Sequence, residues 1–167
     1  MKSRSQNRDG EIALLLEMLD QAFDKSAWHG TNLRGSLRGI GADTAAWRPT
    51  PRRHAIWELT LHAAYWKYAV RRRLREEPRG SFELEGSNWF PAGDPADEKG
   101  WKQAVRLLSK EHRELRATVE ELDPARLDVR GGTGKFTNRQ LIVGAAAHDL
   151  YHTGQIQLLK KLRAEGR

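Results

Sequence analysis

Apolar residues at alternating three- and four-residue steps are the feature that most constrains how this chain folds. The spacing is clearest in one stretch, where it runs through Trp101, Val105, Leu108, His112, Leu115, Val119 and Leu122. Residues at these steps share one face of an α-helix. Asp94 and Pro95 provide an acceptable N-cap and first helical residue, and Asp123-Pro124 ends the pattern. We therefore predict a helix that begins at Asp94-Pro95 and ends at Asp123-Pro124.

Three further segments have the same helical period. They extend from about residue 9 to 25, from about His54 to Arg75, and onward from Thr137. Thr137 and Gln140 have the spacing of a capping box, which is a strong signal for a helix start. No segment alternates convincingly in the manner of a β-strand. Four amphipathic helices of this kind predict an all-α fold, a four-helix bundle with long connections.

The chain length predicts one domain over residues 1–167, with residues 1–8 as a flexible tail. The 167 residues include 38% hydrophobic residues, which is enough for a sizeable core. The connections 26–53, 76–94 and 123–136 are long for so compact a domain, and loops of this length often carry function. Residues 26–53 are expected to contain a further short helix, and the glycines of 123–136 predict mobility.

Composition excludes several kinds of site. The chain has no cysteine, so any metal must be held by histidine or carboxylate side chains. The amino-terminal residues lack the apolar core of a signal peptide, and no run approaches the ~18 apolar residues of a membrane span. We therefore expect a cytoplasmic protein without a membrane partner.

The net charge of +7 raises the question of nucleic-acid binding. Basic residues form a dense patch only at Arg71, Arg72, Arg73 and Arg75. Acidic residues follow this patch at once, and cations at the end of a helix complement its dipole. The pattern favours a solvated helix end and disfavours a nucleic-acid partner.

Histidines occupy core positions on the predicted helices. His148 and His152 are four residues apart, so both imidazoles lie on one helix face, where they can hold one ion at Zn–N distances of ~2.0–2.1 Å. His62 lies three residues after Leu59 and four before Trp66, so it also points toward a buried stripe. Buried imidazoles need partners for both ring nitrogens, and a shared metal ion supplies one.

The residue pattern alone leaves the third metal ligand open. His112 also lies on a core stripe, so it is an alternative to His62 or a fourth ligand. His29 and His54 lie in or beside a connection, where solvation is expected.

Several motifs resemble a known family. They are Ala27-Trp28-His29-Gly30, Arg48-Pro49, His54-Ala55-Ile56-Trp57-Glu58-Leu59, Leu61-His62-Ala63-Ala64-Tyr65-Trp66, and Ala147-His148-Asp149-Leu150-Tyr151-His152-Thr153-Gly154-Gln155-Ile156. Together they are similar to the DinB/YfiT-like superfamily. The similarity covers nearly the whole chain, and the segment from His148 to Ile156 is its most specific part.

The resemblance implies a four-helix bundle with a metal ion on His62, His148 and His152. It leaves His112 as a core histidine or a neighbour of the ligands. It also implies zinc or nickel as the metal and a homodimer more often than a monomer. The superfamily includes thiol-dependent S-transferases and isomerases, proposed hydrolases, and members without known activity, so it does not specify the reaction.

A divalent ion on neutral histidines lowers the pKa of a bound water or thiol, which favours hydrolysis or thiol transfer. Glu58 and Asp149 are the nearest carboxylates in helical geometry and are weak candidates for a catalytic base, each equally able to orient a histidine. The candidate residues of a substrate pocket are Trp28, His29, Trp66, Trp89 and Tyr151.

Three functions remain compatible with the sequence. The first is a metal-dependent enzyme for a small molecule, with thiol transfer ahead of hydrolysis because thiol transfer asks less of the protein. The second is a structural or regulatory metal-binding module without catalysis. The third is a DNA-associated protein, which the net charge suggests and the position of the arginine patch at a helix end disfavours.

Overall fold

The computed structural model describes residues 2–130 and 134–166 of the chain. Its four long helices are α1 (Lys2–Phe23), α4 (Ile56–Leu74), α5 (Glu98–Glu120) and α6 (Asn138–Ala164). Its connections contain the short helices α2 (Leu33–Ser36) and α3 (Ala42–Ala46) and the 3₁₀ turn η1 (Pro124–Arg126). Over the described ranges β-structure is limited to an isolated bridge between Arg130 and Thr137. The prediction of an all-α fold is confirmed.

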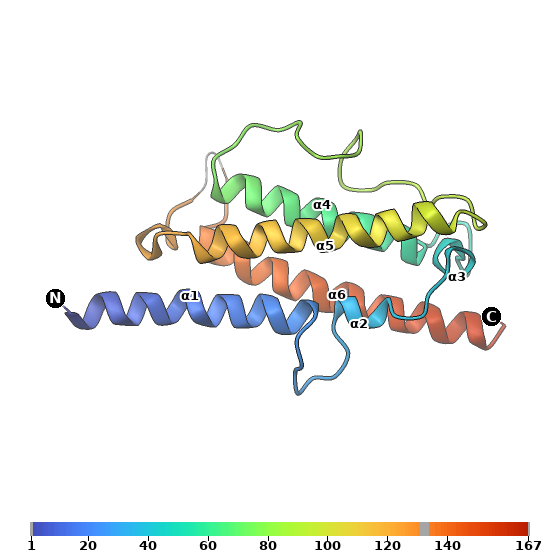
Figure 1. The fold of residues 1–167 in the computed structure, drawn as a ribbon, viewed down its shortest axis with the longest axis horizontal. Helices are drawn as coiled ribbons and strands as arrows, with labels where there is room; N and C mark the ends of the chain where they lie inside the picture. The colour runs from blue at the N-terminus through green and yellow to red at the C-terminus, as the bar shows by residue number, and fades with distance from the viewer. Residues whose placement is uncertain (1, 131–133, 167) are drawn as a thin grey trace.

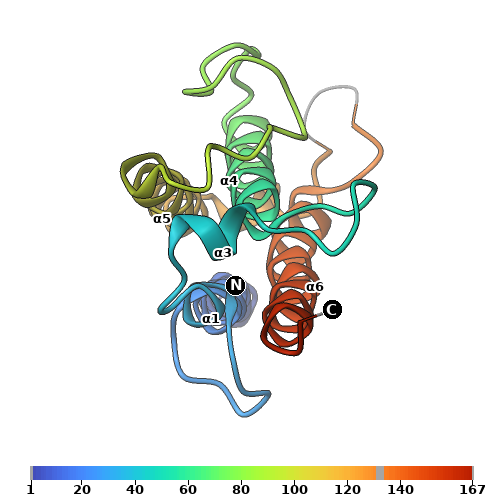
Figure 2. The same cartoon turned by 90° about the vertical axis from the view of Figure 1, so that its right-hand side faces the viewer.

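The four long helices lie lengthwise beside one another (Figure 1). In the end view of Figure 2, α4, α5, α1 and α6 occupy four corners around a common centre. Both α4 and α1 pack against α5 and α6, which accounts for this arrangement. The connection between α4 and α5 crosses the outer side of these two helices (Figure 1).

The interior has two apolar clusters with polar residues between them. One cluster contains the buried apolar residues of α4 as far as Ala64 and of α5 as far as Leu108. The other contains those of α4 from Val70 onward and of α5 from Leu115 onward. We call the buried polar side chains in the central parts of α4, α5 and α6 the polar layer, and they are His62, Lys67, Glu111, His112, Asp149, His152 and Thr153. The candidate site belongs to this layer.

Helix α5 begins at Glu98, so the prediction of a start at Asp94-Pro95 was wrong. Asp97 is the N-cap, and its Oδ1 accepts a hydrogen bond from the Gly100 amide at 2.9 Å. Asp94 instead opens a turn, in which its side chain accepts from the Ala96 amide and its carbonyl from the Asp97 amide. Aspartate stabilises turns and N-caps through the same local bonds, so residue type alone does not separate the two roles.

The start of α6 is as predicted. Thr137 Oγ1 accepts from the Gln140 amide at 3.3 Å, and Gln140 Oε1 accepts from the Thr137 amide at 2.9 Å, which completes the capping box. Helix α1 begins at Lys2, earlier than the expected start near residue 9. Residues 131–133, in the connection predicted to be mobile, lie outside the described residues.

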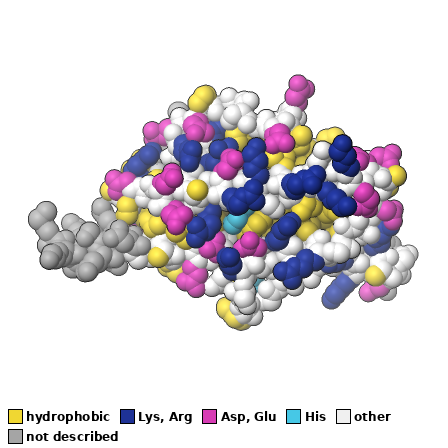
Figure 3. Space-filling view, in the orientation of Figure 1, with side chains coloured by type: hydrophobic (Ala, Val, Ile, Leu, Met, Phe, Trp, Pro, Cys, Tyr) yellow, Lys and Arg dark blue, Asp and Glu magenta, His cyan; other side chains and the backbone are white. Residues whose placement is uncertain are grey.

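The surface carries charges of both signs. Lys and Arg side chains are intermixed with Asp and Glu on the face shown in Figure 3. Near the end of α4, Arg71 pairs with Glu114 at 2.9 Å and Arg75 donates to Thr118 Oγ1 at 2.8 Å. None of the described helices is both long and apolar enough to cross a lipid bilayer.

Candidate metal centre

Three predicted ligands meet between α4 and α6. His148 Nε2 lies 3.2 Å from His62 Nε2 and 3.0 Å from His152 Nε2. His62 and His152 are buried, and His148 is partly buried. The helix α6 places its two histidines one turn apart on the face toward α4, where His62 comes from the opposite side. Each residue thus offers one nitrogen to a common point.

The outer nitrogens of two of these rings determine where their protons lie. His62 Nδ1 lies 2.7 Å from the carbonyl oxygen of Asn88, and His152 Nδ1 lies 2.6 Å from Oε1 of Gln155. Carbonyl and amide oxygens only accept hydrogen bonds, so both Nδ1 atoms carry the proton. Their Nε2 lone pairs therefore point at one another.

This donor set fits a divalent cation. Converging lone pairs repel one another unless a cation lies between them, because a neutral imidazole with its proton on Nδ1 has only an acceptor at Nε2. The separations of 3.0 and 3.2 Å are close to the roughly 3.3 Å between nitrogens of a tetrahedral site with Zn–N bonds of ~2.0–2.1 Å. The group of described ligand-type residues at this point contains the three histidines and no carboxylate. Three neutral ligands leave room for a further ligand on the ion.

The electrostatics of the site keep the histidines neutral. Burial lowers the pKa of His62 to about 4, although the hydrogen bond to Asn88 opposes this shift. Burial, together with the neighbouring histidines, lowers the pKa of His148 to about 3. The pKa of His152 is also lowered, chiefly by burial. Near neutral pH all three rings are therefore unprotonated at one nitrogen, as metal ligands must be.

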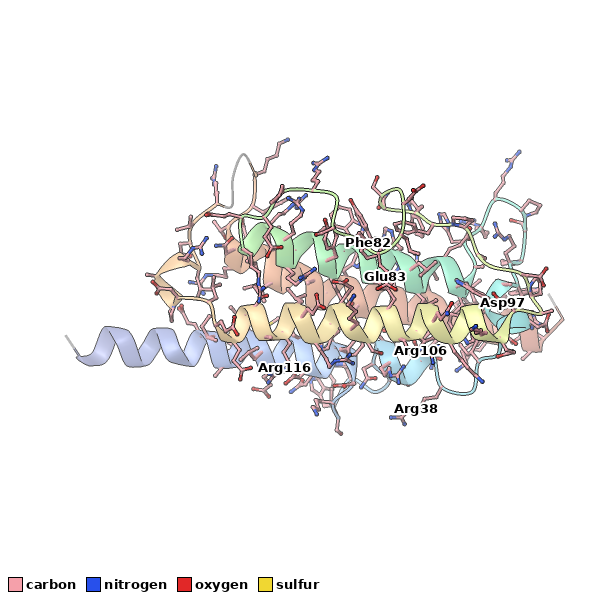
Figure 4. All side chains as sticks on the ribbon, turned by 45° about the horizontal axis from the view of Figure 1, so that its top comes forward. Arg38, Phe82, Glu83, Asp97, Arg106 and Arg116 are labelled. Atoms are coloured by element: carbon pink, nitrogen blue, oxygen red, sulfur yellow. The ribbon has the colours of Figure 1, made fainter. Side chains whose placement is uncertain are left out.

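The long connection between α4 and α5 supplies residues that hold the site from outside. Asn88 accepts from His62 through its backbone carbonyl and from Trp66 Nε1 through its side chain, at 2.9 Å in the second case. Its φ of 67° lies in the left-handed region, which asparagine tolerates better than most residues. Phe82 anchors the same connection against Tyr68 of α4, with ring centroids 5.2 Å apart (Figure 4).

We expect Asn88→Ala to weaken metal binding by about 10–100-fold, as is typical when a partner of a ligand histidine is lost. Alanine lacks the side-chain bond to Trp66 and disfavours the φ of 67°, so the carbonyl that orients His62 should move. Competition with a chromophoric chelator measures the affinity. Asn88→Gly removes the side-chain bond to Trp66 but still favours a positive φ, so it separates the contribution of that bond from the contribution of the backbone conformation. Equal affinities in parent and Asn88→Ala would contradict this role of the loop.

The aromatic residues predicted to line a pocket have different locations. Trp89 stacks on His62 with ring centroids 3.8 Å apart and on His54 at 3.6 Å, and its ring centroid lies 6.5 Å from that of His152. Trp66 presents its edge to His62 and His148, and Tyr151 presents its edge to His152 while its side chain is 64% exposed. Trp89 and Trp66 thus cover the histidines from two directions.

The structure does not bring Trp28 and His29 to the histidines. Both lie in the connection between α1 and α2, which extends away from α4 on the opposite side of the molecule (Figure 2). Trp28 is 97% exposed. They remain candidates only if another molecule brings them to a pocket.

The two candidate carboxylates are engaged elsewhere. Glu58 accepts from the Ala55 amide at 2.8 Å and from Arg48 at 3.2 Å, so it caps the start of α4. Asp149 is 1% exposed and pairs with Lys67 of α4 inside the polar layer. Neither carboxylate is hydrogen-bonded to a ligand histidine.

His112 is a core residue outside the triad. Its ring stacks on Phe23 with centroids 3.7 Å apart, and its Nδ1 lies 3.4 Å from Nζ of Lys67. Burial and the charge of Lys67 lower its pKa to about 2. The structure thus places His112 beside the Lys67–Asp149 pair and not with the three converging histidines.

We expect the metal-free protein to lose stability as the pH falls below 6.5. The ordinary pKa of 6.5 applies to His112 in the unfolded chain, whereas its pKa in the folded chain is about 2. Between these values the unfolded state binds a proton that the folded state rejects, which lowers the free energy of unfolding by up to about 1.4 kcal/mol per pH unit. Denaturant titrations at several pH values from 7 to 4 measure how steeply the free energy of unfolding changes with pH.

His112→Phe is the matched variant, because it keeps an aromatic ring against Phe23 and removes the titrating group. The free energy of unfolding of this variant should depend less steeply on pH, because unfolding takes up about one proton fewer than in the parent. Identical slopes would show that His112 is protonated in the folded protein.

The fold and the site together define a helical protein with a three-histidine centre between two of its long helices. A family model described as the DinB superfamily matches residues 27–156, a range that contains all three histidines. The chain belongs to the DinB superfamily. No curated protein and no solved structure matches the chain.

Three residues that the structure connects to the site had no role predicted from the sequence. Gln155 follows His152 by three residues, a spacing that favours contact on a helix. Lys67 lies four residues after Ala63 and three before Val70, the same kind of position that identified His62 as buried. Asn88 has no comparable signal, since its contact with His62 spans a connection of irregular structure.

Proposed function

We propose that this protein is a divalent-metal-dependent enzyme that transfers a small-molecule thiol, built as a four-helix bundle of the DinB/YfiT-like type. The observation that carries the proposal is the convergence of three Nε2 atoms on one point. Two of the rings, those of His62 and His152, carry their proton on Nδ1, which faces away from this point. Zinc or nickel suits such an all-nitrogen donor set.

A divalent ion at this point would lower the pKa of a thiol or water molecule bound to it. The protein's own contribution is positional. His62, His148 and His152 would hold the ion through neutral ligands, so its full charge would act on the substrate. Trp66 and Trp89 border the histidines with apolar surface, which keeps bulk water from part of the site.

Thiol transfer is favoured over hydrolysis by the engagement of the carboxylates. Hydrolysis is assisted by a general base within hydrogen-bond reach of the attacking water. Glu58 is occupied by the amide at the start of α4 and by Arg48, and Asp149 is occupied by Lys67. A thiol of lowered pKa needs no such base once its proton has left.

The proposed reaction joins a thiol to an electrophilic carbon. The sulfur forms a new carbon–sulfur bond, the bond between that carbon and its leaving group breaks with the electron pair going to the leaving group, and the thiol proton passes to solvent. No oxidant or reductant is required.

The test uses zinc- and nickel-loaded protein with a panel of small thiols and 1-chloro-2,4-dinitrobenzene as the electrophile. We expect at least one thiol to form its thioether faster with loaded protein than with chelated protein or with His148→Ala. An ester panel in parallel tests hydrolysis. Fully loaded protein that turns over neither panel would overturn the proposal in favour of a non-catalytic metal-binding module.

A further inference from the structure

A pocket of about 260 Å³ opens beside the histidines, between α4 and α6. Trp66, Val70 and Arg73 line it from α4, and Leu141, Gly144 and His148 line it from α6. Because α4 and α6 run in opposite directions (Figure 1), the backbone of Arg73 lies at the end of the pocket remote from His148, whereas its guanidinium reaches back over the ring of Trp66. The distance along α4 from Trp66 to Arg73 is about 10 Å, from seven residues at ~1.5 Å each.

The side chain of Arg73 forms no ion pair and no hydrogen bond with the described residues. Its guanidinium lies over the ring of Trp66, 5.9 Å from the centroid. The neighbouring arginines differ: Arg71 pairs with Glu114, Arg72 donates to the carbonyl of Glu77 at 2.8 Å, and Arg75 donates to Thr118. Arg73 is therefore the arginine of this patch whose guanidinium has only an aromatic ring as its partner among the described residues, and it lines a largely apolar pocket.

The chemistry of this pocket selects a ligand with two unlike parts. Trp66, Val70 and Leu141 provide apolar surface, and a guanidinium binds carboxylates through paired, charge-assisted hydrogen bonds. A volume of about 260 Å³ is below the ~300–1,000 Å³ of pockets for drug-sized ligands, so the ligand is small.

We propose that this pocket binds a small amphipathic carboxylate, with its apolar body against Trp66 and Leu141 and its carboxylate on Arg73. His148 lines the same pocket, so the bound ligand lies beside the candidate metal centre. That this ligand is the substrate rests on the proposed function, whereas its binding depends only on the pocket. Arg73 is accordingly a residue that determines specificity.

The test measures binding of octanoate to zinc-loaded protein by calorimetry, with octylamine as the ligand of opposite charge. We expect octanoate to bind and octylamine to bind at least tenfold more weakly. Arg73→Gln should weaken octanoate binding by at least tenfold, in line with the loss of a charged hydrogen bond. Arg79→Gln removes the same charge from an exposed position and should leave binding unchanged.

A second pair of variants tests the pocket itself. A Cβ at Gly144 would meet no atom within 4 Å, and the same holds for Gly154 of α6, which does not line the pocket. Gly144→Leu should therefore fill the pocket and abolish octanoate binding, whereas Gly154→Leu should leave it intact. The zinc content of every variant is measured, so that loss of the metal centre is not mistaken for loss of the pocket.

Octanoate binding that survives Arg73→Gln would mean that the carboxylate binds the ion directly and would overturn the proposal. Equal binding of octylamine, or binding unaffected by Gly144→Leu, would do the same. If octanoate behaves as expected and no thiol reacts, the proposed function fails and the pocket stands. If 8-mercaptooctanoate binds more tightly than octanoate to zinc-loaded protein, the pocket and the metal centre accept one ligand together.

Discussion

His148→Ala should abolish binding of one equivalent of divalent metal. His148 is the middle ligand, because its Nε2 lies within 3.2 Å of both His62 Nε2 and His152 Nε2. Its removal leaves two ligands on different helices and a cavity where the third was. The loss should exceed the ~10–100-fold effect of changing a partner of a ligand. Metal analysis of protein made without a polyhistidine tag, after dialysis against zinc, measures the stoichiometry.

Two further variants make this experiment decisive about the ligand set. His62→Ala should also lose the metal, whereas His112→Phe should retain one equivalent because His112 stacks on Phe23 and faces Lys67. Thermal unfolding of each variant without metal shows whether the fold persists. Undiminished zinc binding by His148→Ala would refute the assignment of the centre to these three histidines.

Lys67→Met should destabilise the protein by about 3–5 kcal/mol, the usual result of removing one partner of a buried ion pair. Lys67 and Asp149 are 2% and 1% exposed, and Oδ1 of Asp149 has no hydrogen-bond partner even in the parent protein. Methionine fills most of the space of lysine and leaves the carboxylate without a counter-charge. Urea unfolding at pH 7 measures the difference.

The double variant Lys67→Met with Asp149→Leu is the control, since it replaces both charges with apolar groups of similar size. It should recover most of the lost stability. The deficit of Lys67→Met should also shrink as the pH falls, because burial raises the pKa of Asp149 and protonation removes the unpaired charge. A single variant as stable as the parent would mean that water reaches Asp149.

Much of the helical structure could be predicted from local patterns. The capping box at Thr137 and Gln140 located the start of α6, and the core stripe of α5 included His112 correctly. The start of α5 was misplaced because Asp94 and Asp97 both have side chains that bond to nearby amides. Which of them caps the helix depends on how the preceding connection packs, and that is a tertiary property.

The part of the candidate site that lies on helices could be predicted from the sequence. Periodicity placed His148 and His152 on one buried face, and the structure brings His62 to them. The choice of His62 over His112 came from family resemblance, because both lie on core stripes. Asn88 and Arg73 were not assigned roles, since one acts through a loop carbonyl and the other is distinguished only by what its neighbours bind.

The polar layer also determines the register of the helices. A slide of α6 along α4 by one turn, about 5.4 Å, would still match leucine and alanine surfaces to one another. The same slide would part His62 from His148 and Lys67 from Asp149 together, leaving buried polar groups unsatisfied in both places. We therefore expect the three histidines of the candidate metal centre and their neighbours to select one alignment of α4 and α6 among several that the apolar clusters alone would allow.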